Sequence, residues 1–83
     1  MVDKYQIAEQ VGARIKGIHL GPNIALKILE EGIRQEDDWW YVPVQPTIEP
    51  PKTSEYYEAL ANVEGQMLDE DDINILFIPM APE

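Results

Sequence analysis

Residues 73–78 constrain the fold of this 83-residue chain more than any other segment. Five of the six are apolar, and Asn74 is the exception. A short run of β-branched and aromatic residues that ends at a proline is typical of a β-strand. Because apolar side chains point to both sides of such a strand, we expect both of its faces to be covered, with Ile75 and Phe77 in the core. The sequence thus predicts a buried strand near residues 73–79.

A second strand is predicted near residues 39–45, where aromatic and β-branched residues again gather. Successive side chains of a strand point to opposite faces, so Trp40 lies on one face with two valines, and Trp39 and Tyr41 lie on the other. Pro43 shares the face of Trp39. Since proline has no N–H for a ladder, Pro43 places this strand at a sheet edge or marks a bulge.

A helix near residues 54–68 is predicted between the two strands. Thr53 or Ser54 is the expected cap, and an extended proline-rich linker over 46–51 precedes it. The spacing of the apolar residues places one buried stripe along this helix: Tyr56, Leu60, Val63 and Met67. Together the three elements make a β-α-β unit, and the length of the connection favours parallel strands.

The N-terminal part is predicted to hold two helices. Asp3 caps the first helix, which buries Ile7 and Val11 and ends at Gly12 or at Gly17. The longer helix is favoured. The shorter one would leave room for a third short strand near residues 14–20.

The second N-terminal helix is predicted to start after the break at residues 21–23 and to stop at Gly32. Its apolar stripe is Ile24, Ala25, Ile28 and Leu29. The predicted fold class is therefore α+β, a small α/β domain spanning 1–83, with two N-terminal helices followed by the β-α-β unit.

The short chain contains no cysteine, so no disulfide supports its small core. Domains of this size often gain stability from a partner subunit, which favours a homo-oligomer. Trp39 and Tyr41 lie on the face opposite to Trp40 and cannot join it in one core. Large aromatic residues anchor interfaces, so Trp39 and Tyr41 are the predicted oligomer interface.

The formal net charge is −10, and it is unevenly distributed. Residues 35–83 hold twelve acidic side chains and one basic side chain, Lys52. Such a surface repels phosphate, so direct binding to nucleic acid is not expected, whereas a basic protein surface is attracted. No apolar stretch is long enough for a membrane span and no signal peptide is evident, so the expected location is cytoplasmic.

Two acidic clusters each stand directly before a predicted strand. In a parallel pair both clusters fall at the same end of the sheet, where they would form an acidic rim that docks a partner. The rim consists of Glu36, Asp37, Asp38, Asp69, Glu70, Asp71 and Asp72.

No pattern in the sequence indicates catalysis. His19 is the only histidine, Ser54 is the only serine, and the glycines lack the spacing of a phosphate loop. We therefore predict no catalytic residue, no metal ligand and no cofactor. An enzyme is the less favoured interpretation. The sequence indicates a small acidic protein-interaction or regulatory domain that self-associates. Two alternatives stay open: an acidic inhibitor that mimics nucleic acid and binds a basic protein surface, and a divalent-cation-binding or small enzyme subunit that uses the acidic clusters.

Overall fold

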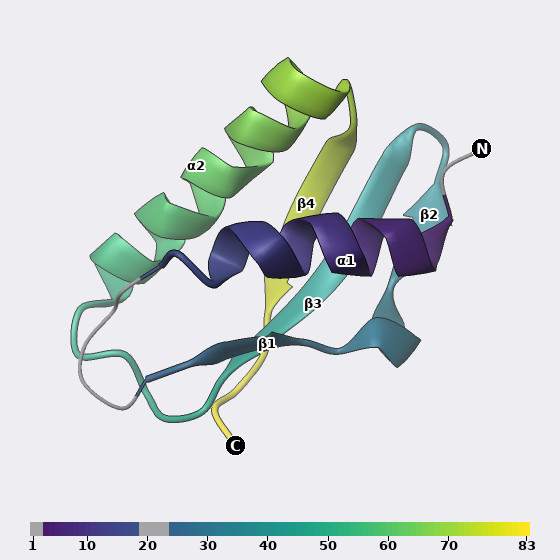
Figure 1. Cartoon of the computed structure of the whole chain (residues 1–83). Coiled ribbons are helices and arrows are strands. Elements are labelled where there is room, and N and C mark those ends of the chain that lie inside the picture. The colour runs from purple at the N-terminus through teal and green to yellow at the C-terminus, as the bar shows by residue number, and fades with distance from the viewer. Residues whose placement is uncertain (1–2, 19–23) are drawn as a thin grey trace.

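The computed structural model describes residues 3–18 and 24–83, and it shows an α+β fold with two α-helices and a four-stranded sheet (Figure 1). In chain order the elements are α1 (Lys4–Ile15), β1 (Leu26–Ile28), the 3₁₀ turn η1 (Glu30–Gly32), β2 (Arg34–Glu36), β3 (Trp39–Pro46), α2 (Thr53–Asp71) and β4 (Asn74–Pro79).

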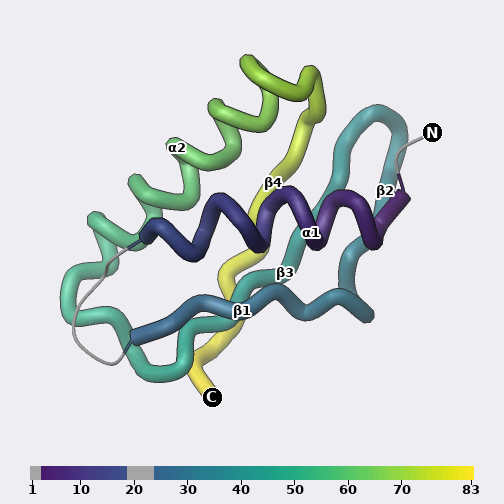
Figure 2. The backbone as a smooth tube through the Cα atoms, in the orientation of Figure 1, coloured from purple at the N-terminus to yellow at the C-terminus, as the bar shows by residue number. Residues whose placement is uncertain are grey.

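Strand β3 organises the sheet because the other three strands all pair with it. β1 and β2 are antiparallel to β3, and β4 is parallel to it, with Trp39 opposite Asn74 and Val44 opposite Pro79. The tube in Figure 2 shows how β3 runs alongside β4 and then past β1. Elements β3, α2 and β4 therefore form a β-α-β unit with parallel strands.

Pro43 lies inside this central strand, so the predicted edge position is wrong, while the predicted irregularity is present. Ile28 pairs with Val44 and Arg34 pairs with Tyr41, so the five residues 29–33 lie opposite only two residues of β3. The Pro43 carbonyl accepts a hydrogen bond from the Leu29 N–H at 3.1 Å. Because the ladder is interrupted by η1 at this point, the N–H that proline lacks is not needed.

Helix α1 starts as the sequence predicts. Asp3 is the N-cap, and its side chain accepts from the Gln6 N–H at 2.9 Å while Gln6 reaches back to the Asp3 N–H. The helix continues through Gly12 and ends at Ile15, so the longer of the two predicted helices is present. Residues 14–18 form no strand, and residues 19 and 20 of the alternative third strand lie outside the described residues.

The second predicted N-terminal helix is wrong. Its start at residues 21–23 lies outside the described part of the chain, and the part described forms β1 and η1 instead. Leu26 and Ile28 are half-buried, and Lys27 between them is exposed. This alternation also fits a strand, in which the side-chain period is two. The segment is short, and pairing with β3 over three residues decides in favour of the strand.

Helix α2 is longer than predicted and buries the predicted stripe of Tyr56, Leu60, Val63 and Met67. Its N-cap is Lys52, without a side-chain cap, so the expected cap at Thr53 or Ser54 is wrong. The helix ends at Asp71, and its C-cap residue Asp72 has a φ of 55° and a ψ of 39°, which are left-handed. Within the described residues, no helix is both long and apolar enough to cross a membrane.

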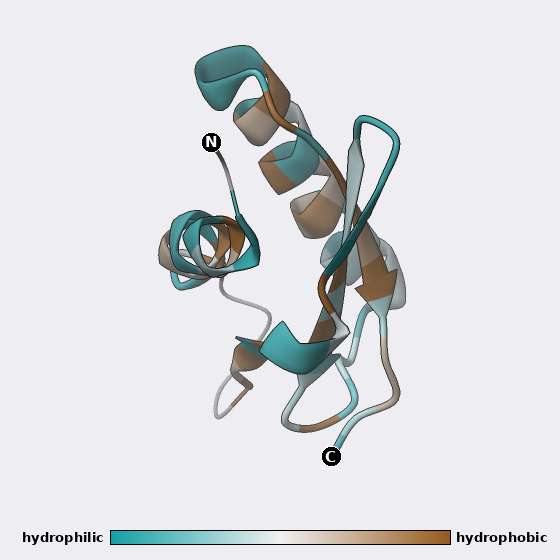
Figure 3. Cartoon of the chain, turned by 90° about the vertical axis from the view of Figure 1, so that its right-hand side faces the viewer, coloured by the Kyte–Doolittle hydropathy of each residue, from teal (hydrophilic) through white to brown (hydrophobic). Residues whose placement is uncertain are grey.

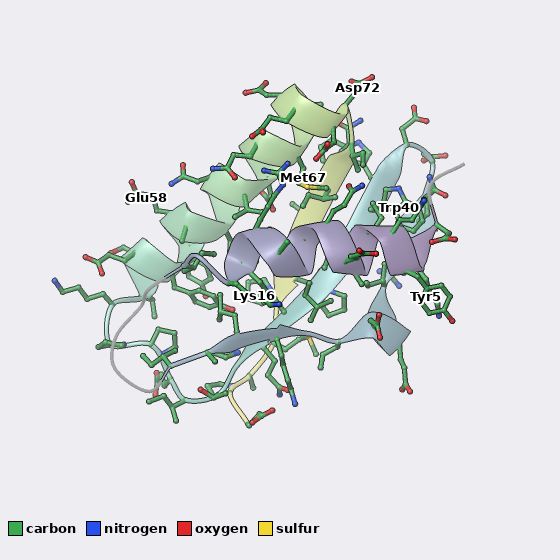
Figure 4. The ribbon with its side chains drawn as sticks, in the orientation of Figure 1. Tyr5, Lys16, Trp40, Glu58, Met67 and Asp72 are labelled. Carbon is green, nitrogen blue, oxygen red and sulfur yellow. The ribbon has the colours of Figure 1, made fainter. Side chains whose placement is uncertain are left out.

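The core lies between the helices and one face of the sheet. Figure 3 shows α1 and α2 on the same side of the strands, and Trp40 and Met67 point into this layer (Figure 4). On β4, Ile75 and Phe77 are buried as predicted, but Leu76 between them is 44% exposed. The expectation that both faces of this strand are covered is therefore wrong.

The free edge of β4 is partly blocked by α2. The Phe77 N–H donates to the Glu64 carboxylate at 2.8 Å, and Pro79 has no N–H to offer. Proline and charged side chains are common devices against edge-to-edge strand pairing. A partner at this edge of the sheet would therefore meet side chains rather than free backbone hydrogen-bonding groups.

One pair of neighbouring substitutions tests the one-sided coverage. Phe77→Ala should lower the free energy of unfolding by about 3–5 kcal/mol, because it opens a cavity in the core. Leu76→Ala should lower it by about 1 kcal/mol or less, since its side chain is half in solvent. Chemical denaturation of both variants measures the difference. Equal losses would mean that Leu76 is covered within the monomer.

Candidate interaction surface

The face of the sheet turned away from the helices carries large apolar side chains. Trp39 is 45% exposed, Tyr41 is half-buried, and Tyr41 stands opposite Leu76 in the parallel register. The guanidinium of Arg34 lies 5.4 Å from the centre of the Tyr41 ring. The structure thus places both predicted interface aromatics on one uncovered surface, which we call the open face.

A groove of about 260 Å³ adjoins the open face where α2 passes the edge strand β4. We call it the Trp39 groove. Leu68, 47% exposed on α2, and Leu76 are the other large, exposed apolar side chains that line it. It is lined by Trp39, Ala61, Glu64, Gly65, Leu68, Asn74, Ile75 and Leu76.

The sequence analysis missed the contribution of α2 to this surface. Leu68 does not belong to the buried stripe of α2 and is exposed. Gly65 is in the interior of α2, and nothing lies within 4 Å of the position that a Cβ would take. A helical glycine costs about 1 kcal/mol relative to alanine, and no contact within the described chain requires one here. Its effect is to leave the floor of the groove open.

The acidic rim is assembled at one end of the molecule, as expected for parallel strands. Trp39 and Asn74 are paired, so the clusters that precede them emerge at the same end of the sheet. In Figure 1 this end holds both the β2–β3 turn and the C-terminus of α2, and Asp72 marks it in Figure 4. All seven rim side chains are exposed.

Arg14 neutralises part of the rim, and no sequence signal connected it to the clusters. Its guanidinium lies 2.8 Å from the Asp71 carboxylate and 3.3 Å from that of Glu70, and it donates to the Met67 sulfur at 3.1 Å. The hydrogen bond that the Arg14 guanidinium donates to the Asp71 carboxylate is the main cause that raises the pKa of Arg14 above its ordinary value. α1 therefore ties itself to the end of α2.

Two of the rim residues also have a backbone role. Asp37, in the β2–β3 turn, and Asp72, at the end of α2, are the two non-glycine residues with positive φ among those described, at 56° and 55°. Aspartate tolerates this conformation better than most residues. Asp38 and Asp69 form no ion pair within the described part of the chain, so their charges are available to a partner.

The described residues offer little to a metal ion or to a reaction. No group of three or more His, Cys, Asp or Glu side chains among them is arranged to hold a metal. Ser54 is exposed in the first turn of α2, and His19 lies outside the described residues. A second pocket of about 420 Å³ between α1 and β1 has a mixed lining that includes Glu9, Lys16 and Glu30.

One buried polar atom lacks a partner. Tyr56 is 4% exposed, and within the described structure its hydroxyl makes no hydrogen bond. Burial, followed by the neighbouring Tyr57, raises the pKa of Tyr56 above its ordinary value. The two rings are stacked with centres 5.4 Å apart. Tyr56 is also one of the residues that line a pocket of about 240 Å³ beside Tyr57, but its hydroxyl oxygen is buried.

No family model, curated protein or solved structure matches this chain.

Arg14→Gln should lower the melting temperature at low ionic strength, because Glu70 and Asp71 then lose their counter-charge. Added salt should narrow the gap to the wild type, since it screens the repulsion that remains in the rim. Lys16→Gln is the matched control, because it removes the same charge from the exposed end of α1. Thermal melts at several salt concentrations measure both variants, and equal shifts would contradict a specific role for Arg14.

Tyr56→Phe should leave the free energy of unfolding unchanged or raise it by about 1 kcal/mol, because it removes a buried hydroxyl without a partner. The pKa of the folded-state hydroxyl is raised, so the folded protein holds this proton more tightly than the unfolded chain. Stability from this residue is complete below about pH 10 and is lost as pH rises through the folded-state pKa.

Denaturation between about pH 8 and pH 11 should therefore show an alkaline loss that is smaller in Tyr56→Phe. Tyr57→Phe is the control on the adjacent exposed ring. An unchanged alkaline loss in Tyr56→Phe would show that another group is responsible.

Proposed function

We propose that this chain is a small protein-interaction domain that self-associates through the open face of its sheet. The single observation that carries the proposal is the one-sided coverage of the sheet. Trp39 and Leu76 stand about half-exposed on the side of the sheet opposite to the one on which the helices pack. Exposed apolar patches on small proteins usually mark interaction sites, and tryptophan and tyrosine are frequent anchors.

The occupant that we propose for the open face is a second copy of the chain. The chain has an accessible surface of 5420 Å², and a standard interface takes about 800 Å² from each partner. Trp39, Tyr41 and Leu76 on β3 and β4 would lie at the centre of such a contact. Covering the open face would also supply the second layer that the outer side of β4 lacks.

Charge repulsion opposes this contact and makes its strength depend on the salt concentration. Each copy carries a net charge of −10, so two copies repel each other. Salt screens exposed charges beyond about 10 Å at 0.1 M, while it leaves apolar contacts intact. Self-association should therefore strengthen as the salt concentration rises.

The other expectations from the sequence belong to the same proposal. An acidic domain of this kind would bind basic protein surfaces rather than nucleic acid, because its excess of carboxylates repels phosphate. A cytoplasmic location is in keeping with the absence of cysteine. No observation within the described residues favours the alternative of a cation-binding or enzyme subunit.

Sedimentation equilibrium over a concentration series tests the proposal. We expect a reversible oligomer whose population rises with salt. Trp39→Ala should weaken assembly by about tenfold or more, because truncation of a central aromatic anchor typically costs about 2 kcal/mol. Tyr5→Ala, which removes a 63% exposed ring from α1, is the control and should leave assembly unchanged. A monomer at every protein and salt concentration would overturn the proposal.

A further inference from the structure

We propose that the Trp39 groove also binds a basic, amphipathic helical segment of another protein, with its apolar side in the groove and its lysine or arginine residues against the acidic rim. The inference deepens the proposed interaction surface by naming the chemistry of a partner. It rests on that surface being a docking site and does not require self-association.

The shape of the groove supports a helical occupant. Its walls are a helix and a strand edge, and three of its large apolar side chains, Trp39, Leu68 and Leu76, are each between 44% and 47% exposed. The one charged side chain among its lining residues, Glu64, is already engaged by the Phe77 N–H. Gly65 leaves space on the floor. Apolar residues at helical spacing dock into grooves of this kind.

The backbone of β4 argues against an extended occupant. Strand addition needs free N–H groups along the edge, but Glu64 occupies that of Phe77 and Pro79 has none. An added strand would have to displace the Glu64 carboxylate. A helix satisfies its own backbone and needs only side-chain contacts, so it suits this edge better.

Charge complementarity determines the kind of helix. Asp38 directly precedes Trp39, and Asp69 directly follows Leu68, so each is the chain neighbour of a residue that lines the groove, and neither forms an ion pair in the described structure. The C-terminus of α2 lies at the same end, and its carbonyl groups add negative potential. A second copy of this acidic chain brings the wrong charge to this position, whereas a cationic helix brings the right one.

The probe is a labelled leucine–lysine amphipathic helix of 19 residues, the length of α2, titrated with the full chain by fluorescence anisotropy. A leucine–glutamate peptide with the same apolar side is its counterpart. We expect the lysine peptide to bind and the glutamate peptide not to bind. The lysine peptide should bind more weakly as salt rises from about 0.05 M to 0.5 M, the opposite of self-association.

Paired variants separate this groove from general charge attraction. Asp38→Asn with Asp69→Asn should weaken binding of the lysine peptide about three- to tenfold, because two exposed carboxylates near the bound charges are lost. Glu49→Gln with Glu58→Gln changes the net charge equally at the other end of α2, where Glu58 is seen in Figure 4, and should change binding less than twofold. Thermal melts confirm that each variant folds.

Leu68→Ala should weaken the lysine peptide about tenfold, because it removes an apolar wall of the groove. The inference is overturned if the lysine peptide does not bind, if both charge pairs weaken it equally, or if Leu68→Ala has no effect. Failure of self-association is seen separately by sedimentation. If the peptide does not bind while the chain assembles through Leu68, a second copy is the occupant and this inference is wrong.

Discussion

Pairing on both edges of β3 is the interaction on which the rest of the structure depends. β1 and β2 pair with different parts of one edge of β3, and β4 pairs with the other edge. Nearly every backbone hydrogen bond of the sheet therefore involves β3. Its alternation then sorts the side chains. Trp40, Val42 and Val44 face the helices and are buried, and Trp39 is left on the other side. The register of β3 thus sets both the core and the open face.

The two helices form a single layer on one face of the sheet. Residues 4–15 and 53–71 form these helices, and both pack on the same face, where Ile7 and Leu60 help to close the core. Neither of them packs on the opposite face. A sheet with a polar outer side tolerates this, yet the outer side here carries Trp39 and Leu76. The exposed apolar surface therefore follows from the arrangement of both helices on one side.

Sequence patterns predicted the parts of the fold in which local signals agree with the tertiary contacts. The Asp3 cap, the buried stripe of α2 and the alternation of Trp39 and Trp40 are all local features, and each is present. The prediction for residues 24–32 was wrong because their apolar pattern fits both a helix and a strand. Pairing with β3 favours the strand. The sequence could not predict that Pro43 lies inside the central strand either. This position depends on η1, which interrupts the pairing with β3 in a segment for which the sequence predicts a helix.

The candidate surface, like the fold, could be predicted only in those parts that depend on local sequence order. Parallel strands bring the acidic clusters to one end, and alternation leaves Trp39 and Tyr41 outside the core, so both features follow from local order along the chain. Arg14, Leu68 and Gly65 belong to the same region, but only the packing of α1 and α2 reveals them. These contacts also divide the acidic residues by role. Asp37 and Asp72 take the left-handed backbone conformation, Glu70 and Asp71 pair with Arg14 of α1, and Asp38 and Asp69 form no ion pair among the described residues. Acidic residues that are neighbours in the sequence therefore have different structural roles, and only the packing of the helices distinguishes them.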